Sequence, residues 1–214
     1  MAKMLYSLIL SEEVVREIDE EARALGTNRS RLINQILAEH VSLKTPAEHI
    51  NDIFSAMEEL LRPCRELTAN FMPFAPSLSL KSSIDYRYRP TVRYELKLTE
   101  GEEDGAMTVI FRTQASELLE SMGEFFRLFA RSECEAVGPV QCERLDYALY
   151  DGRFVRNIPR DFYRGKSPEQ AAEVLSNYVR LFDRLMKKYL VGSLSENELR
   201  AELKAAALRR EIVI

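Results

Sequence analysis

The sequence is poor in the residues on which most enzyme sites depend. Glycine occurs 8 times in 214 residues, and histidine occurs only twice, at His40 and His49. Scarce glycine disfavours phosphate-binding loops, and two histidines leave almost nothing for a metal centre or a histidine general base. We therefore predict no catalytic residues, no metal and no cofactor, and we do not expect an enzyme.

Other absences bear on where the chain can reside. No stretch approaches the roughly 18 consecutive apolar residues of a membrane-spanning helix, so no membrane partner is expected. The apolar opening from Met4 to Leu10 is too short for the core of a signal peptide. Three cysteines, at Cys64, Cys134 and Cys142, are too few for a disulfide framework. We therefore expect plain thiols in a reducing cytoplasm.

The net charge of −4 is spread along the chain without any polybasic segment. Residues 46–76 and 114–140 each carry −3, whereas residues 141–166 carry +2. Polybasic arms give nucleic-acid affinity without sequence preference, and this chain has none. Any binding of nucleic acid must therefore come from a shaped surface.

The first 45 residues predict a strand and two helices. Residues 4–10 alternate in the manner of a short strand. Ser11 is a typical helix cap, Gly26 is a typical helix stop, and Asn28 can cap a second helix. A lone strand with two short helices cannot bury a core of its own. The pattern therefore favours a dimer in which two strands pair antiparallel over four helices.

This order of elements resembles a ribbon-helix-helix domain of the Arc/MetJ/CopG kind. The matching segments are Met4–Leu10, Ser11–Val15, Ala22–Gly26 and Asn28–Ile33. They cover about 40 of the 214 residues and say nothing about the rest. The resemblance implies a homodimer whose two-stranded ribbon enters the major groove of double-stranded DNA.

Carried over by position, the resemblance implies two groups of DNA-contacting residues. The outward face of the ribbon reads base edges, and the amino end of the second helix holds a backbone phosphate. The residues so assigned are Lys3, Leu5, Ser7 and Ile9 on the ribbon, and Asn28, Arg29, Ser30 and Arg31 on the helix.

The ribbon departs from the polar pattern usual in this family. Of Leu5, Ser7 and Ile9, only Ser7 can form a hydrogen bond with a base. An apolar face is costly to leave in water, which favours its being covered by another domain or partner. A second interpretation therefore stays open, in which the unit only dimerises the chain.

The rest of the chain predicts a second unit. Thr45-Pro46-Ala47-Glu48 opens a helix, and the two prolines of residues 71–77 indicate a connector. The predicted organisation is a ribbon-helix-helix domain at 1–45, a helix and connector at 46–77, and an α+β domain at 78–214. That domain is expected to combine an antiparallel sheet with C-terminal helices. Its expected strands span 82–89, 92–98, 106–112, 145–150 and 154–158.

Three weaker signals each have a functional and a structural interpretation. Tyr86–Arg89 and Arg93-Tyr94 alternate aromatic and basic residues, which fits single-stranded nucleic acid or a sheet with one packed face. Gly165–Ser167 resembles the end of a phosphate-binding loop or a helix cap. Arg180, Arg184 and Lys187 form a phosphate-contacting stripe or a solvated helix face. We favour the structural interpretation in each case.

The sequence thus predicts a cytoplasmic α+β protein that binds double-stranded DNA as a homodimer and regulates transcription. An accessory factor for plasmid transfer or partition would show the same features. The alternative is an interaction protein in which the N-terminal unit only brings two C-terminal domains together. The DNA target, and the effector or protein partner of residues 78–214, are left open.

Overall fold

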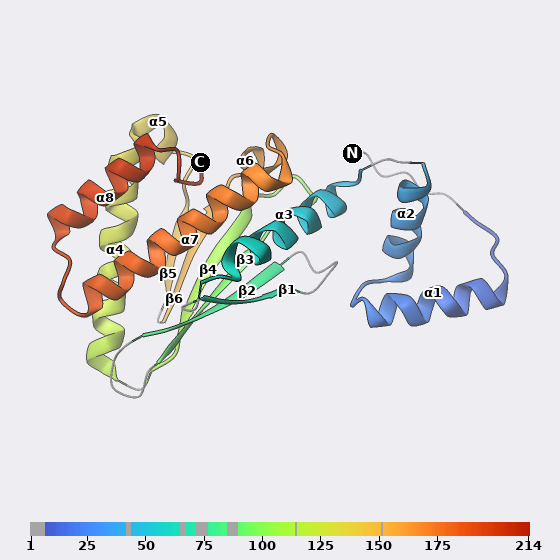
Figure 1. The fold of residues 1–214 in the computed structure, drawn as a ribbon, viewed down its shortest axis with the longest axis horizontal. Helices are drawn as coiled ribbons and strands as arrows, with labels where there is room; N and C mark the ends of the chain where they lie inside the picture. The colour runs from blue at the N-terminus through green and yellow to red at the C-terminus, as the bar shows by residue number, and fades with distance from the viewer. Residues whose placement is uncertain are drawn as a thin grey trace.

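The computed structural model describes residues 7–41, 44–64, 67–71, 77–84, 90–113, 115–150 and 152–214. In these ranges the chain combines helices with one antiparallel sheet, which confirms the predicted α+β class (Figure 1).

The helices and strands follow one another in three groups. Helices α1 (Glu12–Ala24), α2 (Arg29–His40) and α3 (Pro46–Leu61) come first. The strands are β1 (Leu67–Phe71), β2 (Ser77–Ser83), β3 (Thr91–Lys97), β4 (Gly105–Phe111), β5 (Tyr147–Tyr150) and β6 (Arg153–Ile158). The other helices are α4 (Ser116–Val137), α5 (Pro139–Cys142), α6 (Arg160–Arg164), α7 (Pro168–Leu190) and α8 (Glu196–Leu208).

Five helices begin at residues whose side chains cap them, and the sequence analysis names four of these residues. Ser11 and Asn28 accept backbone amides at the starts of α1 and α2. Thr45, Ser167 and Ser195 form capping boxes at the starts of α3, α7 and α8. Each box satisfies two backbone amides that a helix start leaves without partners. The interpretation of Gly165–Ser167 as part of a helix cap is confirmed.

The sheet has the order β1-β2-β3-β4-β6-β5, and every pair is antiparallel. Gly152 begins the turn into β6 with φ of +64°, and a Cβ there would lie 2.6 Å from the carbonyl oxygen of Phe111. A side chain at this position would therefore be both strained and obstructed. This glycine allows β6 to approach β4 closely.

Helices α3, α4 and α7 pack on one face of the sheet, whereas α1 and α2 do not (Figure 1). Along β2 and β3 every second side chain is buried, as expected for a sheet with one packed face. Phe182 of α7 lies at the centre of the core, with its ring centroid 4.6 Å from that of Phe129 and 5.8 Å from that of Phe154. Phe126 of α4 stacks on Phe154 at 5.0 Å. Aromatic contacts thus join α4 and α7 to the sheet.

The segment predicted as a helix and connector contributes directly to this core. Ile53, Phe54 and Met57 of α3 are fully buried, and α3 packs along α7. Strand β1, which the sequence analysis did not predict, pairs with β2. The two prolines suggested a boundary here, but the apolar face of α3 requires a partner that only the sheet and α7 provide.

The second strand of the sheet also differs from its prediction. We expected a strand at 82–89, whereas β2 spans Ser77–Ser83 and residues 85–89 lie outside the described ranges. Leu78, Leu80 and Ser82 alternate on the buried face of β2. Their two-residue period is the signal of the strand. The four serines of this stretch obscure it, because serine is common in loops.

Helices α1 and α2 form a separate unit at one side of the molecule (Figure 1). Among their residues only Ala22, Leu32 and Ala38 are buried. The core of the sheet region is far larger and contains no residue of α1 or α2. The structure therefore separates a thinly packed helix pair from a well packed α+β body.

Candidate nucleic-acid interface

Gly26 shapes the turn between α1 and α2. Its φ of +65° lies in the left-handed region that glycine adopts without strain. In this conformation the amide of Thr27 donates to the carbonyl of Ala22 at 2.8 Å, and that of Gly26 to Arg23 at 3.2 Å. These two bonds form a Schellman motif, which ends α1 and turns the chain into α2.

The amino end of α2 carries the predicted phosphate-binding residues. The side-chain oxygen of Asn28 accepts the amide of Arg31 at 3.0 Å. The amides of Arg29 and Ser30 have no acceptor within the described chain. Free amides and the positive end of the helix dipole together suit an anion such as a phosphate. This helix end is therefore chemically suited to the predicted contact.

Both arginines of this helix end are ion-paired. Arg29 donates from Nε to Oδ1 of Asp19 at 2.7 Å, and its Nη2 bonds the other carboxylate oxygen. This hydrogen bond is the main cause that lowers the pKa of Asp19 below its ordinary value. Arg31 pairs with Glu100, which lies between β3 and β4. The arginine side chains are 50% and 39% exposed, so a phosphate can compete for each guanidinium.

The predicted ribbon can be located only in part. Lys3 and Leu5 lie outside the described residues. Ser7 and Ile9 are exposed, and residues 7–10 form no strand pairing within the described chain. A ribbon strand of this family pairs with the strand of a second chain, so one chain cannot display the pairing. The ribbon therefore stays a prediction.

The α1–α2 unit leaves much of its apolar surface uncovered. The large apolar side chains between Leu8 and Val41 that are at least 39% exposed are Leu8, Ile9, Leu10, Val14, Ile36, Leu37 and Val41. We call these seven residues the N-terminal apolar surface. Such an amount of exposed apolar side chain within so few residues is typical of a surface that a partner covers.

Among the weaker sequence signals, Tyr94, Arg184 and Lys187 have structural roles. Tyr94 is fully buried, and its hydroxyl donates to Asp183 at 2.8 Å, whereas Arg93 lies on the opposite, half-exposed face. Arg184 donates twice to Glu202 at 3.2 Å, and Lys187 pairs with Asp183 at 2.7 Å. The side chains of this helix stripe are thus engaged within the chain.

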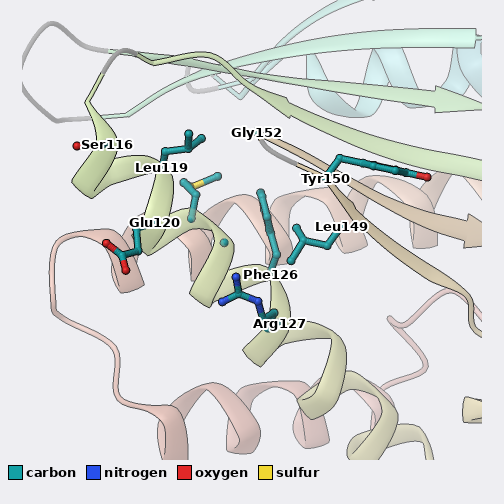
Figure 2. Close-up of a pocket in the computed structure, with 10 residues that line it drawn as sticks. Ser116, Leu119, Glu120, Phe126, Arg127, Leu149, Tyr150 and Gly152 are labelled. Carbon is teal, nitrogen blue, oxygen red and sulfur yellow. The ribbon is translucent and has the colours of Figure 1, made fainter.

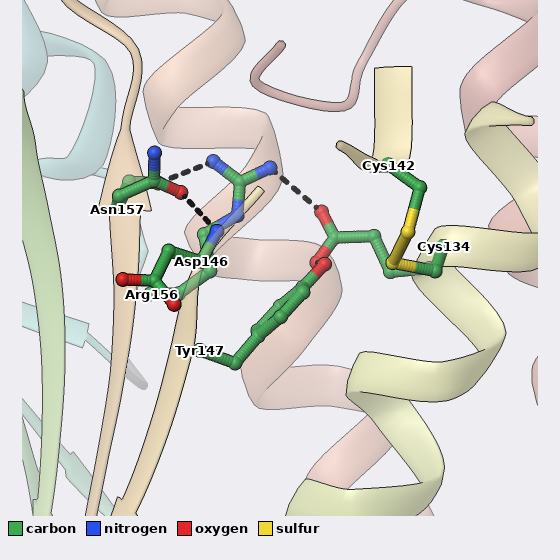
Figure 3. Close-up of a disulfide and its surroundings, with 7 residues drawn as sticks. Cys134, Cys142, Asp146, Tyr147, Arg156 and Asn157 are labelled. Atoms are coloured by element: carbon green, nitrogen blue, oxygen red, sulfur yellow. Dashed lines mark hydrogen bonds and ion pairs between the residues drawn. A yellow bond between two sulfur atoms is a disulfide. The ribbon is translucent and has the colours of Figure 1, made fainter. Parts of the chain in front are cut away.

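A buried polar cluster in the sheet region was not predicted (Figure 3). Arg156 of β6 and Glu133 of α4 are both fully buried and form an ion pair of 3.0 Å. Tyr147 and Tyr178 donate to the two oxygens of Glu133 at 2.8 and 2.9 Å. Burial and the neighbouring carboxylate raise the pKa of both tyrosines. The two charges are paired with each other, and within the cluster only Nε of Arg156 has no hydrogen-bond partner among the described residues.

One sequence signal could have revealed this arginine. Arg156 lies two residues after Phe154 and two before Ile158, so the strand period places it on the buried face. Its guanidinium also donates to the carbonyls of Asn157, at 2.7 Å, and of Val213. Glu133 has no comparable signal, because an acidic residue late in a helix is usually solvated.

The prediction of plain thiols at Cys134 and Cys142 is wrong for this structure. The two cysteines form a disulfide that ties the end of α4 to α5 (Figure 3). The short segment between them contains Gly138 with φ of +83°, and this turn brings the two Cα atoms to 4.8 Å. Cys64 is free. A reducing compartment disfavours such a bond, so the cytoplasmic location stays a prediction.

A pocket of about 460 Å³ lies between α4 and the β5–β6 turn (Figure 2). Leu149 points toward Phe126 at its base, whereas Tyr150 extends away from that ring. Glu120 and Arg127 line the same pocket and are exposed. The described lining contains no histidine, cysteine or buried charged group, so it offers no catalytic arrangement.

The part of the chain that the structure describes has neither a membrane-spanning helix nor a group of metal ligands. No helix in it is long and apolar enough to span a bilayer. No three of its His, Cys, Asp and Glu side chains are grouped as metal ligands. Comparisons of the chain with protein-family models, with curated proteins and with solved structures gave no match.

Proposed function

We propose that the protein binds double-stranded DNA as a homodimer and acts as a transcriptional regulator. The amino end of α2 carries this proposal. It presents two free amides, at Arg29 and Ser30, beside two arginines that are at least one third exposed. A helix start with this equipment is a ready site for a backbone phosphate.

The N-terminal apolar surface supports the dimer. A ribbon-helix-helix chain buries its apolar residues only when a second chain supplies a strand and two helices. Residues such as Leu10, Val14 and Leu37 are exposed in the single chain, as this arrangement requires. Pairing two chains also places two copies of the α2 amino end at the same duplex.

Paired substitutions test the phosphate contact. Arg29→Ala removes the guanidinium, whereas Asp19→Asn removes only the carboxylate that holds it. If Arg29 contacts phosphate, Arg29→Ala weakens binding to every duplex and lowers the salt slope by about one, while Asp19→Asn maintains or raises affinity. Arg31→Ala and Glu100→Gln form a second pair with the same expectation. The measurement is fluorescence anisotropy with a random duplex, titrated with salt.

A second candidate function is dimerisation without DNA binding. The ion pairs of both arginines within the chain favour it, because each guanidinium already has a carboxylate. The apolar character of Ile9 favours it as well, since this side chain cannot hydrogen-bond a base. If the wild-type protein is dimeric but shows no salt-dependent affinity for duplex DNA, the dimerisation function replaces the DNA-binding one.

A further inference from the structure

The second face of the sheet is not covered by any helix in the described chain. The helices pack on the face that contains Leu80, Tyr94 and Val109, all fully buried. The alternate residues of β2, β3 and β6 point to the other side and are exposed or half-exposed. An antiparallel sheet commonly has one solvated face, so exposure alone is unremarkable. The charge of this face is what indicates the kind of molecule that could bind there.

The charge of this open face is opposite to that of the whole chain. Its strand residues include the four basic residues Lys81, Arg93, Lys97 and Arg153, but only one acidic residue, Glu95. The whole chain has a net charge of −4. Basic side chains are therefore concentrated on this face while the rest of the molecule is acidic.

The strand register places three of these cations in one row across the sheet. Lys81 of β2 is opposite Arg93 of β3, and Arg93 is opposite Ile110 of β4. Ile110 is opposite Arg153 of β6, which is opposite Tyr150 of the edge strand β5. With strands about 4.8 Å apart, the row from Lys81 to Tyr150 is roughly 19 Å long. We call Lys81, Arg93, Arg153 and Tyr150 the cationic row.

Among the described residues, Glu95 is the only anion paired with a cation of the cationic row. Like charges directly opposite each other on adjacent strands destabilise a sheet, and Lys81 and Arg93 are such a pair. Arg93 contacts Glu95 at 3.2 Å, in a pair whose side chains are about 40% exposed and therefore weakly bound. Lys81 and Arg153 make no ion pair with any described residue. Charge complementarity therefore calls for an external polyanion.

We propose that the open sheet face binds single-stranded nucleic acid along the cationic row. Lys81, Arg93 and Arg153 contact successive phosphates, and the 62% exposed Tyr150 stacks on a base at the edge of the sheet. A single strand fits better than a duplex, because duplex bases already stack on one another and leave none for Tyr150. This site is distinct from the α2 amino end of the proposed function and does not depend on it.

Fluorescence anisotropy of the full chain tests the cations. The probe is a labelled oligothymidylate about 20 nucleotides long, with the duplex of equal length measured beside it. We expect Lys81→Gln/Arg93→Gln/Arg153→Gln to weaken oligothymidylate binding at least tenfold and to reduce the salt slope by about two. The matched control, Arg62→Gln/Lys188→Gln/Lys204→Gln, removes three exposed cations at the end of α3 and on α7 and α8, on the helix side, and should change affinity less than threefold.

A second pair of variants tests the stacking contact. Tyr150→Leu keeps an apolar side chain but removes the ring, and it should weaken oligothymidylate binding about tenfold. Tyr150→Phe keeps the ring and should retain wild-type affinity. Circular dichroism melts of all variants establish that they remain folded, as expected for exposed positions.

Three results would overturn this inference. The first is that the wild type does not bind oligothymidylate at low salt. The second is that the cationic-row and control triple variants lose oligothymidylate affinity equally. The third is that the cationic-row variant loses affinity only for the duplex. If the α2 amino end does not contact phosphate, the result is different. Arg29→Ala then leaves the affinity for duplex unchanged, and the affinity for oligothymidylate is unaffected in either case. The two proposals can therefore fail independently.

Discussion

The α1–α2 unit and the sheet region differ in how completely each buries its own apolar and charged side chains. In the sheet region even a charged pair, Glu133 with Arg156, is fully buried and hydrogen-bonded. In the α1–α2 unit only three residues are buried, and the N-terminal apolar surface remains in water. A region that closes its own core can stand alone, whereas one that does not needs a partner. The comparison is the basis for proposing that the first unit self-associates and that the second folds on its own.

The largest expected effect concerns where the independent region begins. We expect a fragment of residues 44–214 to fold, because α3 packs along α7 and β1 pairs with β2. A fragment of residues 78–214, cut at the boundary predicted from sequence, lacks both elements and should not fold. Urea unfolding followed by far-ultraviolet circular dichroism distinguishes the two. A cooperative transition in the shorter fragment would show that α3 is dispensable.

The buried ion pair gives the next largest effect. Arg156→Met leaves the carboxylate of Glu133 buried without its cation and should lower the free energy of unfolding by about 3–5 kcal/mol. Glu133→Gln/Arg156→Met removes both charges, and the glutamine amide can accept from one tyrosine and donate to the other, so this variant should cost much less. The measurement is urea denaturation at neutral pH. Equal losses in the single and double variants would contradict an electrostatic origin.

The N-terminal apolar surface should control association. We expect Leu37→Asp to weaken self-association about a hundredfold, close to 2.7 kcal/mol, because it buries a charge in the dimer. Val140 of α5 is 73% exposed in the sheet region, and Val140→Asp should leave association unchanged. Sedimentation velocity over a range of concentrations measures both. If the wild-type protein is monomeric at all concentrations, the proposal that the α1–α2 unit associates with a second copy is wrong.

The smallest expected effect is the difference in stability between Gly→Ala substitutions at two positions with open space around them. A Cβ added at Gly26 or at Gly101 meets no atom within 4 Å, but only Gly26 has a positive φ. Gly26→Ala should therefore destabilise the α1–α2 unit by about 1 kcal/mol, whereas Gly101→Ala should be close to neutral. Thermal melts measure the difference. Equal stabilities would show that the turn at Gly26 is not strained by a side chain.

Local signals in the sequence predicted the local structure well. Ser11, Asn28 and Thr45 cap their helices because capping depends on residues three positions apart. The strands expected at 145–150 and 154–158 overlap β5 and β6, because the alternation that marks a strand is also local. The assignment of α3 and β1 to the core could not be reached in this way, because it depends on contacts with α7 and β2 that no local pattern encodes.

For the candidate interface too, the sequence predicted the local features but not the contacts between distant residues. The sequence identified Asn28 as the start of α2, and the structure places Arg29 and Ser30 there. The pairing of Arg31 with Glu100 joins residues far apart in the sequence and left no signal. The cationic row was equally hidden, since Lys81, Arg93 and Arg153 become neighbours only through the register of three strand pairs.

The strand order carries a consequence for the kinetics of folding. Every pairing in the described sheet joins consecutive strands except that of β4 with β6, whose partners lie more than 40 positions apart. The β1–β4 meander and the β5–β6 hairpin can each form through short loops, but joining them requires closing the long segment that contains α4. We therefore expect this closure to limit the folding rate, with Phe154 as a residue whose substitution slows refolding.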